Sequence, residues 1–477
     1  MSNAVQQSLD YLFRPSSIAL AGITVANPDH WTRVFLDALT AFEFDRPLYL
    51  VNPRGGEING RKVYTSMADI PDSVEYVIST VSAPAAPGLI MECARKGVRA
   101  VHFCTSGFSE TGEEEGIKLQ NKLVELSRQT GIRIIGPNCM GVYCPESRVS
   151  FNPEFPRESG SVAYISQSGG NTAILVRDAG LRGVRFRKVM SYGNACDLNE
   201  SDFLEYLATD PDTKIIAMYI EGVRDGMRFR KALEKAAREK TLVLLKGGAT
   251  EGGARATASH TGALAGSQRT WNALCKQLNI IGVDTLPELA DVLVALEFMS
   301  IPEGRNVALL GGGGGPSVLI TDQFERYGLK VPRLPEDIRL KIREYSQAAG
   351  NMLRNPIDYG QNMWEAGKFS KTLNIVNRWA DVDFITIYLG AGMMPPEMMP
   401  MMAGLIQDVL ELTRDASKPL AMVFVPSIVP READVAFPII KKLVSLKCPV
   451  FYSFEGAAKA ISAVLSHDGQ RLARLRA

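Results

Sequence analysis

Short apolar, β-branched runs alternate with longer helical patterns along nearly all 477 residues of the chain. Such runs fit strands that are buried on both faces, as in parallel sheets covered by helices. The alternation therefore predicts βαβ units and an α/β fold built from doubly wound parallel sheets. A chain of this length exceeds one compact core, and a prior of roughly 150 residues per domain predicts about three domains.

The apolar runs fall into three successive groups. Strands of the first group are expected at residues 17–20, 47–51, 76–81, 100–103 and 133–135. Those of the second are expected at 161–166, 214–220 and 241–245, before a helix at 286–299. Those of the third are expected at 307–310, 383–389 and 420–425, before a helix at 454–465. Domain boundaries are therefore placed near residues 150 and 300, with a linker at 301–304.

The composition excludes several classes of protein. Hydrophobic residues make up 46% and charged residues 22%, as in ordinary folded domains. The 53 basic and 52 acidic residues nearly cancel, so bulk charge attracts neither nucleic acid nor an anionic membrane. The seven cysteines are scattered without a CxxC pair, which indicates a reducing cytoplasm and no cysteine metal site. No apolar run approaches the roughly 20 residues that span a membrane, and no signal peptide is recognisable, so a cytoplasmic, unanchored protein is expected.

A segment of small residues at 247–266 follows the strand that ends at Lys246 and contains His260, one of four histidines. A long segment without apolar anchors predicts a functional loop. A neutral imidazole can attack a phosphoryl group when its other nitrogen donates to a carboxylate. Glu221 is a candidate for that carboxylate, because it ends the strand at 214–220 on the sheet edge where ligands bind. A solvated loop histidine explains the same residues equally well, so both interpretations stay open.

Residues 165–171, Ile-Ser-Gln-Ser-Gly-Gly-Asn, join a strand to a helix, so free amides of the first helical turn should face an anion. The hydroxyls of Ser166 and Ser168 could add donors. A tight turn without a ligand is the alternative, and for the second glycine-rich turn, at 311–315, we favour it. Residues 136–141 allow a close backbone approach to a ligand. No activating base accompanies Cys139, which is expected to be a small buried residue.

Taken together, these segments resemble the alpha subunit of succinyl-CoA synthetase and, more closely, that of ADP-forming acetyl-CoA synthetase and related NDP-forming acyl-CoA synthetases. The likeness extends over essentially the whole chain. Its most specific element is Ala-Ser-His-Thr-Gly-Ala-Leu-Ala-Gly at residues 258–266, which is similar to the family's phosphohistidine loop. The resemblance implies that His260 is transiently phosphorylated and that Glu221 orients it.

Further matching segments occur in the family's order, at residues 51–56, 106–110, 136–138 and 166–170. By this resemblance the phosphoryl group is bound by Ser166, Ser168, Gly169, Gly170 and Asn138. Coenzyme A is bound by Gly22, Asn52, Pro53, Arg54, Val81, Ser106 and Gly107. Residues 355–358, Asn-Pro-Ile-Asp, resemble a motif of the third domain to which we assign no role, and no metal ligand is expected.

The resemblance also implies three domains and a reaction. Residues 1–150 would form a Rossmann-like CoA-binding domain, 151–300 a flavodoxin-like ligase domain with the phosphohistidine loop, and 301–477 a second flavodoxin-like ligase domain. The implied reaction converts an acid, CoA and ATP reversibly into acyl-CoA, ADP and phosphate, through an acyl phosphate and phospho-His260. Nothing in the chain reads as an ATP-grasp domain. A separate ATP-grasp beta subunit is therefore expected to bind ATP or ADP with Mg²⁺ in a hetero-oligomer.

One departure from the family supports an alternative. The CoA loop is usually glycine-rich, whereas residues 21–31 keep one glycine and add bulky side chains. A non-catalytic sensor or scaffold that binds CoA or acyl-CoA would tolerate this change, but it would not need His260, Glu221 and the Ser-Gln-Ser-Gly-Gly turn. A lysine acyltransferase ranks lower because no acetyltransferase domain is recognisable, and the missing GxGxxG after the first strand argues against a dinucleotide-dependent oxidoreductase.

Overall fold

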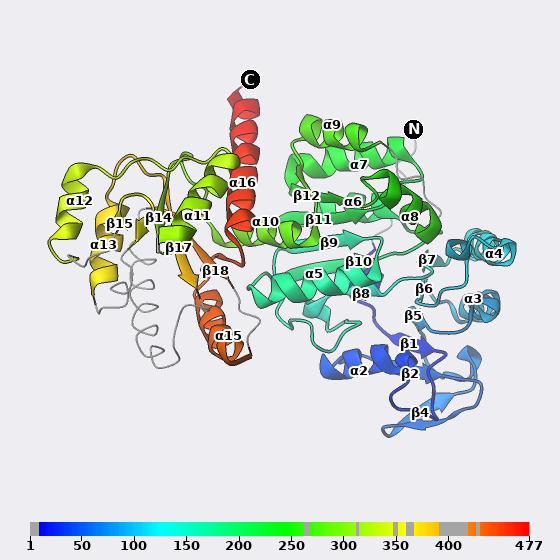
Figure 1. The fold of residues 1–477 in the computed structure, drawn as a ribbon. Helices are drawn as coiled ribbons and strands as arrows, with labels where there is room; N and C mark the ends of the chain where they lie inside the picture. The colour runs from blue at the N-terminus through cyan, green and yellow to red at the C-terminus, as the bar shows by residue number, and fades with distance from the viewer. Residues whose placement is uncertain are drawn as a thin grey trace. The chain divides into compact units, whose positions relative to one another are not determined.

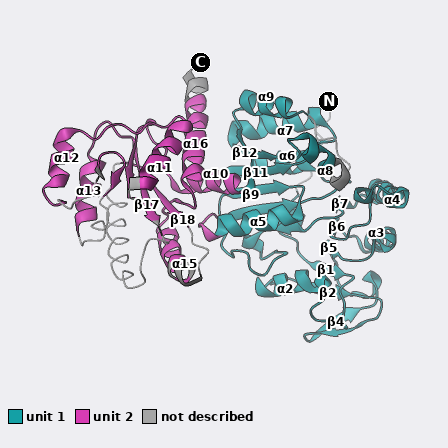
Figure 2. Ribbon diagram, viewed as in Figure 1, with its two compact units in different colours: residues 1–180, 185–286 teal, residues 181–184, 287–477 magenta. Residues whose placement is uncertain are grey.

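The computed structural model describes residues 9–261, 267–311, 314–346, 352–358, 367–390, 418–425 and 430–476. These residues form an α/β fold with three sheets whose strands are mostly parallel (Figure 1), which confirms the predicted fold class. The chain divides into two compact units, residues 1–180 with 185–286 and residues 181–184 with 287–477 (Figure 2). The first two sheets belong to unit 1 and the third to unit 2. The domain boundaries near residues 150 and 300 stay predictions.

The first sheet has β1 at a topological switch point. Its order is β3 (Gly56–Ile58), β4 (Arg61–Tyr64), β2 (Leu48–Val51), β1 (Ile18–Ala21), β5 (Tyr76–Ser79), β6 (Ala100–Phe103) and β7 (Arg133–Ile135). Helices α3 (Ala86–Lys96) and α4 (Glu114–Thr130) pack side by side. The antiparallel β3–β4 hairpin was not predicted, although its turn carries the hairpin signal Asn59-Gly60, with positive φ at both residues.

The second sheet places β9 between β11 and β10. Its order is β13 (Ile281–Val283), β12 (Thr241–Lys246), β11 (Ile215–Ile220), β9 (Val162–Ser166), β10 (Phe186–Ser191) and β8 (Gly141–Tyr143). Helix α5 (Gly169–Leu181) lies on one side, and α6 (Glu200–Thr209), α7 (Gly226–Glu239) and α9 (Gln268–Leu278) lie on the other (Figure 1). The strand order reverses at β9, so the carboxyl end of β9 is where ligand sites of such sheets occur.

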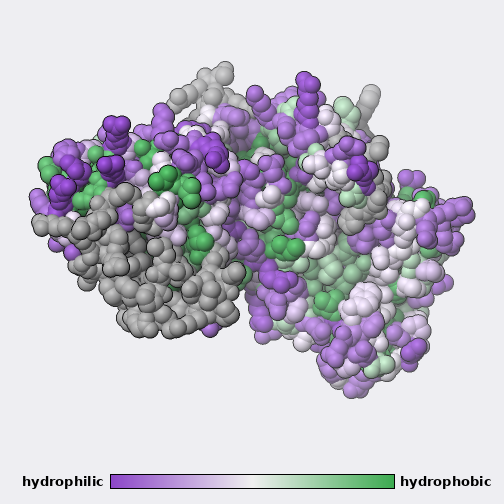
Figure 3. All heavy atoms as spheres, in the orientation of Figure 1, coloured by the Kyte–Doolittle hydropathy of each residue, from purple (hydrophilic) through white to green (hydrophobic). Residues whose placement is uncertain are grey.

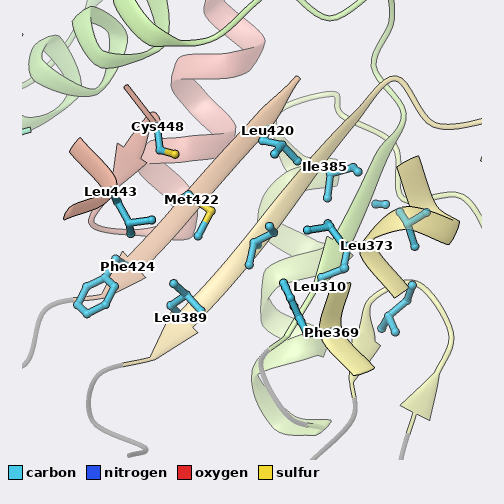
Figure 4. Close-up of a cluster of buried hydrophobic side chains, with 14 of the residues drawn as sticks. Leu310, Phe369, Leu373, Ile385, Leu389, Leu420, Met422, Phe424, Leu443 and Cys448 are labelled. Atoms are coloured by element: carbon cyan, nitrogen blue, oxygen red, sulfur yellow. The ribbon is translucent and has the colours of Figure 1, made fainter. Parts of the chain in front are cut away.

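The third sheet has a core of large aliphatic and aromatic side chains. Its order is β15 (Met352–Leu353), β16 (Ile357–Asp358), β14 (Val307–Leu310), β17 (Phe384–Gly390), β18 (Leu420–Val425) and β19 (Val450–Phe451). Figure 4 shows the side chains of Leu310, Ile385, Leu389, Met422, Phe424, Phe369, Leu373 and Leu443 in this core. Each fully buried leucine or phenylalanine contributes roughly 1.5–3 kcal/mol. Helices α11 (Gly314–Arg326) and α16 (Phe454–Arg476) lie side by side, and α15 (Pro430–Ser445) packs near β19.

Further helices complete the described part of the chain. They are α1 (Asp10–Phe13), α2 (Val34–Ala41), α8 (Glu251–Thr261), α10 (Leu286–Phe298), α12 (Glu336–Arg343) and α13 (Lys368–Asn377), with 3-10 helices η1 (Trp31–Arg33), η2 (Met67–Asp69), η3 (Ala83–Ala85), η4 (Ser109–Thr111) and η5 (Pro145–Ser147). Among the described residues, no helix combines the length and the apolar character that a membrane span requires. Figure 3 shows hydrophilic side chains spread over the visible face of each unit.

The predicted loop over residues 247–266 is wrong for the part that forms helix α8 (Glu251–Thr261). The hydroxyl of Thr250 accepts a backbone N–H of the first turn, and Glu251 pairs with Arg255 one turn later at 2.9 Å. Alternating alanines add helix propensity. Small side chains therefore favoured a helix where we expected irregular backbone.

Candidate functional site

The turn after β9 is closed by its own serine hydroxyls. The Ser166 hydroxyl donates to the Ser168 carbonyl at 2.9 Å, and the Ser168 hydroxyl accepts the Asn171 N–H at 3.3 Å. Ser168 therefore caps the N-terminus of α5, where the helix dipole favours an anion. Ser166 is fully buried and shapes the turn, so its part in phosphate binding stays a prediction. A Cβ added to Gly170 would meet open space, whereas a Cβ at Gly169 would lie 2.7 Å from Met140 Cγ.

The second part of the site is the turn at residues 136–141, which abuts the β9 turn. The Met140 N–H donates to the Ser191 hydroxyl at 3.1 Å. Gly193 leaves room for Asn138, because a Cβ there would lie 2.3 Å from the Asn138 carbonyl oxygen. The structure therefore brings Asn138 to the same sheet edge as Ser168, Gly169 and Gly170.

A buried histidine, His102, packs against the turn at residues 136–141 and forms a hydrogen bond with it. The His102 Nε2–H donates to the Cys139 carbonyl at 2.9 Å, and the ring lies where a Cβ on Gly141 would fall. Burial lowers the pKa of His102 to about 4, so the ring is neutral. Cys139 is buried too, and burial raises the pKa of its thiol, which fits the small buried residue that we expected.

The loop after β6, which contains Ser106 and Gly107, is tied to this turn through Asn194. The Glu110 carboxylate accepts the Gly107 N–H at 2.6 Å and the Asn194 side-chain N–H through its other oxygen. Asn194 also donates to Gln120 at 2.9 Å. The sequence analysis gave no role to Asn194 or Gln120, because these contacts join residues far apart in the chain.

Helix α8, which contains His260, lies against η4 (Ser109–Thr111) of the same loop. The His260 backbone belongs to the described helix, but its side chain and residues 262–266 lie outside the described part of the chain. The structure thus places the helix of His260 beside the Ser106–Gly107 loop and directly after β12.

Glu221 follows β11 and is held by three neighbours. The Gln167 side-chain oxygen accepts the backbone N–H groups of Glu221 and of the next residue. The Tyr219 hydroxyl donates to Glu221 Oε1 at 3.0 Å, and the Lys246 ammonium donates to the Glu221 carbonyl at 2.7 Å. Burial lowers the pKa of Lys246, and the Glu221 charge partly offsets this effect. The roles of Gln167, Tyr219 and Lys246 were not predicted, although Tyr219 lies in a predicted strand, Lys246 ends one and Gln167 directly follows one.

Five of the residues predicted to bind coenzyme A lie at the carboxyl ends of β1, β2 and β5, namely Gly22, Asn52, Pro53, Arg54 and Val81. A Cβ on Gly22, which has φ +91°, would lie 2.7 Å from the Val81 nitrogen, so glycine is required there. The Asn52 side chain donates to the Ile23 carbonyl at 2.8 Å. Pro53 and Arg54 are exposed in the following turn. These loops therefore form one edge of the first sheet.

The loop between Gly22 and Trp31 is held by a buried arginine instead of glycines. The Arg33 guanidinium donates to the Thr24 carbonyl at 2.7 Å and to the Val25 carbonyl at 3.2 Å. Trp31 stays 51% exposed beside this loop. Among the described residues, no group of three or more His, Cys, Asp or Glu side chains could hold a metal ion.

Two families of known domains match parts of this chain. Residues 16–145 match the family described as CoA binding domain, and residues 159–296 match the family described as succinyl-CoA ligase like flavodoxin domain. The chain is 34% identical over 429 residues to the acetate–CoA ligase [ADP-forming] II subunit alpha of Pyrococcus furiosus, covering 89% of this chain and 92% of that protein.

Two further similarities extend the comparison. The 4-hydroxybutyrate–CoA ligase [ADP-forming] of Nitrosopumilus maritimus is 32% identical over 73% of this chain, which spans 50% of that protein. The solved structure of the dinucleotide-forming acetyl-coenzyme A synthetase 1 of Ca. Korarchaeum cryptofilum, in complex with phosphate and ADP, has a TM-score of 0.80. It is 29% identical in sequence and covers 98% of both chains.

Proposed function

Because this chain belongs to the family of ADP-forming acetate–CoA ligase alpha subunits, we propose that it is the CoA-binding, phosphohistidine-carrying subunit of an acyl-CoA synthetase. The observation that most supports this proposal is the convergence of the Ser168 turn, Asn138 and Glu221 at the sheet edge where helix α8 follows β12. A binding module without chemistry would not need a buried carboxylate at this edge.

In the proposed reaction, phosphate attacks the thioester of an acyl-CoA, the C–S bond breaks, and CoA leaves as an acyl phosphate forms. The phosphoryl group then passes to a ring nitrogen of His260: the P–O bond to the acyl group breaks, a P–N bond forms, and the acid is released. ADP takes the phosphoryl group from His260 to give ATP. Glu221 would accept the N–H of the other ring nitrogen, so that the attacking nitrogen stays unprotonated. The N-terminus of α5 would offset the negative charge of the phosphoryl oxygens.

The nucleotide is proposed to bind elsewhere. We assign ATP or ADP, with Mg²⁺, to an ATP-grasp beta subunit that joins this chain in a hetero-oligomer, because the family relatives include proteins named as alpha subunits. The chain is proposed to act in the cytoplasm, since all seven cysteines are free thiols. The proposed acyl substrates are short-chain acids of the kind named for two of the relatives, acetate and 4-hydroxybutyrate.

The first test is phosphorylation of the purified chain. We expect labelled phosphate and one member of a panel of acyl-CoAs to place an acid-labile, base-stable label on the peptide that contains His260. His260→Ala should abolish the label, because the proposal makes His260 the nucleophile, whereas the Lys246 nitrogen at this sheet edge is an ammonium that donates to the Glu221 carbonyl. The matched control His467→Ala, which removes a histidine of α16 in unit 2, should keep it.

The same experiment separates the two functions. Label on the unsubstituted chain that is lost in His260→Ala supports the enzyme and identifies the acyl class. CoA binding without label across a broad panel would instead favour the sensor or scaffold.

Removal of Arg33 should weaken CoA binding. Arg33→Ala leaves the carbonyls of Thr24 and Val25 without their donor and loosens the loop after β1, so ordering that loop on binding costs more. We expect the Kd for CoA, measured by isothermal titration calorimetry, to rise about tenfold. Arg46→Ala is the matched control, because Arg46 also donates to a backbone carbonyl, that of Pro15, at the opposite end of the strands. Equal Kd values for the two variants would contradict a role of Arg33 in the CoA loop.

A further inference from the structure

Side chains connect the turn after β9 with Glu221 by hydrogen bonds. Tyr219, in β11, donates its hydroxyl hydrogen to Glu221 Oε1 at 3.0 Å. The side chain of Asn171, in the first turn of α5, lies close enough to the same hydroxyl to lower the pKa of Tyr219 against the larger effects of burial and of Glu221. Asn171 is also the residue whose N–H binds the capping hydroxyl of Ser168. The tyrosine hydroxyl therefore lies between the N-terminus of α5 and the Glu221 carboxylate.

The backbone around Glu221 is fixed from the same turn. Gln167 lies between the two serines, is buried, and accepts the N–H groups of Glu221 and Gly222 through one side-chain oxygen. These two bonds hold the backbone of Glu221 but not its side chain, and the last side-chain torsion sets the plane of the carboxylate. That torsion is broad and nearly two-fold in a free glutamate. A hydrogen bond to one carboxylate oxygen therefore fixes the plane in which the second oxygen can accept an imidazole N–H.

Glycine at 247 makes room for the tyrosine and the glutamate together. A Cβ at this position would lie 2.7 Å from the Tyr219 hydroxyl oxygen and 3.1 Å from Glu221 Cγ. Burial, and then the charge of Glu221, raise the pKa of Tyr219, so its hydroxyl stays protonated and acts as the donor. Gly247, a few residues before helix α8, is thus packed against Tyr219 and Glu221.

We propose that Tyr219 is a positioning residue that orients the Glu221 carboxylate toward His260 and couples it to the turn that would hold the phosphoryl group. This inference rests on the proposed function, since it gives Tyr219 a role only in phosphoryl transfer to His260. The transfer itself is the one described above, with the P–O bond broken, the P–N bond formed, and the ring N–H held by Glu221. Tyr219 exchanges no atom in that step and acts through Glu221 alone.

The test measures how fast the full-length chain is labelled by acetyl phosphate that carries the label on phosphorus, which bypasses CoA. Four proteins are compared: the unsubstituted chain, Tyr219→Phe, Glu221→Gln and the double variant. A hydrogen bond to a charged group is lost in Tyr219→Phe, so we expect labelling to slow about tenfold. In the Glu221→Gln background the same substitution should add less than a twofold loss, because its target carboxylate is gone.

Tyr206→Phe is the matched control. It removes a tyrosine hydroxyl that donates to the Asp10 carboxylate at 2.6 Å, in the same compact unit but away from β11. We expect this variant to be labelled at the unsubstituted rate. Unchanged labelling of Tyr219→Phe, or a full tenfold loss on top of Glu221→Gln, would overturn the inference alone. Absence of label on the unsubstituted chain, both with acetyl phosphate and with labelled phosphate and every acyl-CoA of the panel, would overturn the proposed function, and the inference with it.

Discussion

Replacing Glu221 with glutamine is expected to slow phosphorylation of His260 by at least about 100-fold. Glutamine keeps the size of the side chain but can present an N–H to the imidazole, and then the ring nitrogen that should attack carries the proton instead. The backbone contacts with Gln167 and Lys246 do not involve the carboxylate, so the fold around the site should be kept. The rate of labelling by acetyl phosphate at constant pH measures the effect.

The matched control is Glu234→Gln. Glu234 lies on α7 in the same unit and pairs with Arg230 one turn earlier at 2.8 Å, outside the sheet edge of the site. Its substitution should leave the labelling rate unchanged. A Glu221→Gln variant labelled within twofold of the unsubstituted chain would show that the carboxylate does not orient the histidine.

The largest expected effect on stability lies in unit 2, at the buried ion pair of Arg182 and Asp291. The Arg182 side chain is 1% exposed, that of Asp291 is 10% exposed, and the guanidinium also lies 4.9 Å from the centre of the Tyr452 ring. Asp291→Ala leaves the buried guanidinium without this carboxylate, so the free energy of unfolding of unit 2 should fall by about 3–5 kcal/mol. The free energy of unfolding is measured by urea unfolding of the full chain, from the transition in which Tyr452 becomes exposed to solvent.

A double replacement tests the physical reason. Arg182→Met with Asp291→Leu removes both charges and keeps apolar volume, so it should recover most of the lost stability. Glu336→Ala removes an exposed carboxylate that pairs with Arg339 on α12 of the same unit, and it should leave the transition unchanged. If Asp291→Ala lowers stability no more than Glu336→Ala does, the pair does not stabilise unit 2.

The strands that could be predicted were those with continuous apolar runs. β1, β5, β9 and β11 each lie within a residue or two of their expected positions, because a strand covered on both faces must be apolar throughout. β10 was missed because it contains Arg187 and Lys188. Both are buried, and both pair with the Asp210 carboxylate, at 3.3 and 3.0 Å. Two adjacent basic residues, which would be expected on an exposed surface, can therefore lie in a central strand when a carboxylate from outside the strand pairs with their charges.

Several residues of the candidate site could be predicted from the sequence, but the hydrogen bonds between them could not. Glu221 and Ser168 were predicted because each follows a predicted strand, and the carboxyl ends of parallel strands meet at one edge. Asn138 was predicted from the family resemblance. Gln167 and Tyr219 were not predicted, because the role of each side chain depends on the groups with which it forms hydrogen bonds. Gln167 contacts a backbone N–H 54 residues away, and Asn194 contacts Glu110, which precedes it by 84 residues.

Local patterns in the chain fix the alternation of strands and helices, the glycines at tight turns and the segment that contains His260, because these follow from periodicity, backbone freedom and a short motif. The neighbours of each functional side chain follow from packing. Tyr219 comes close to Asn171 only because β11 and β9 pair in register and α5 begins directly after β9. Long-range contacts of this kind depend on the closure of the whole sheet, and no local pattern encodes them.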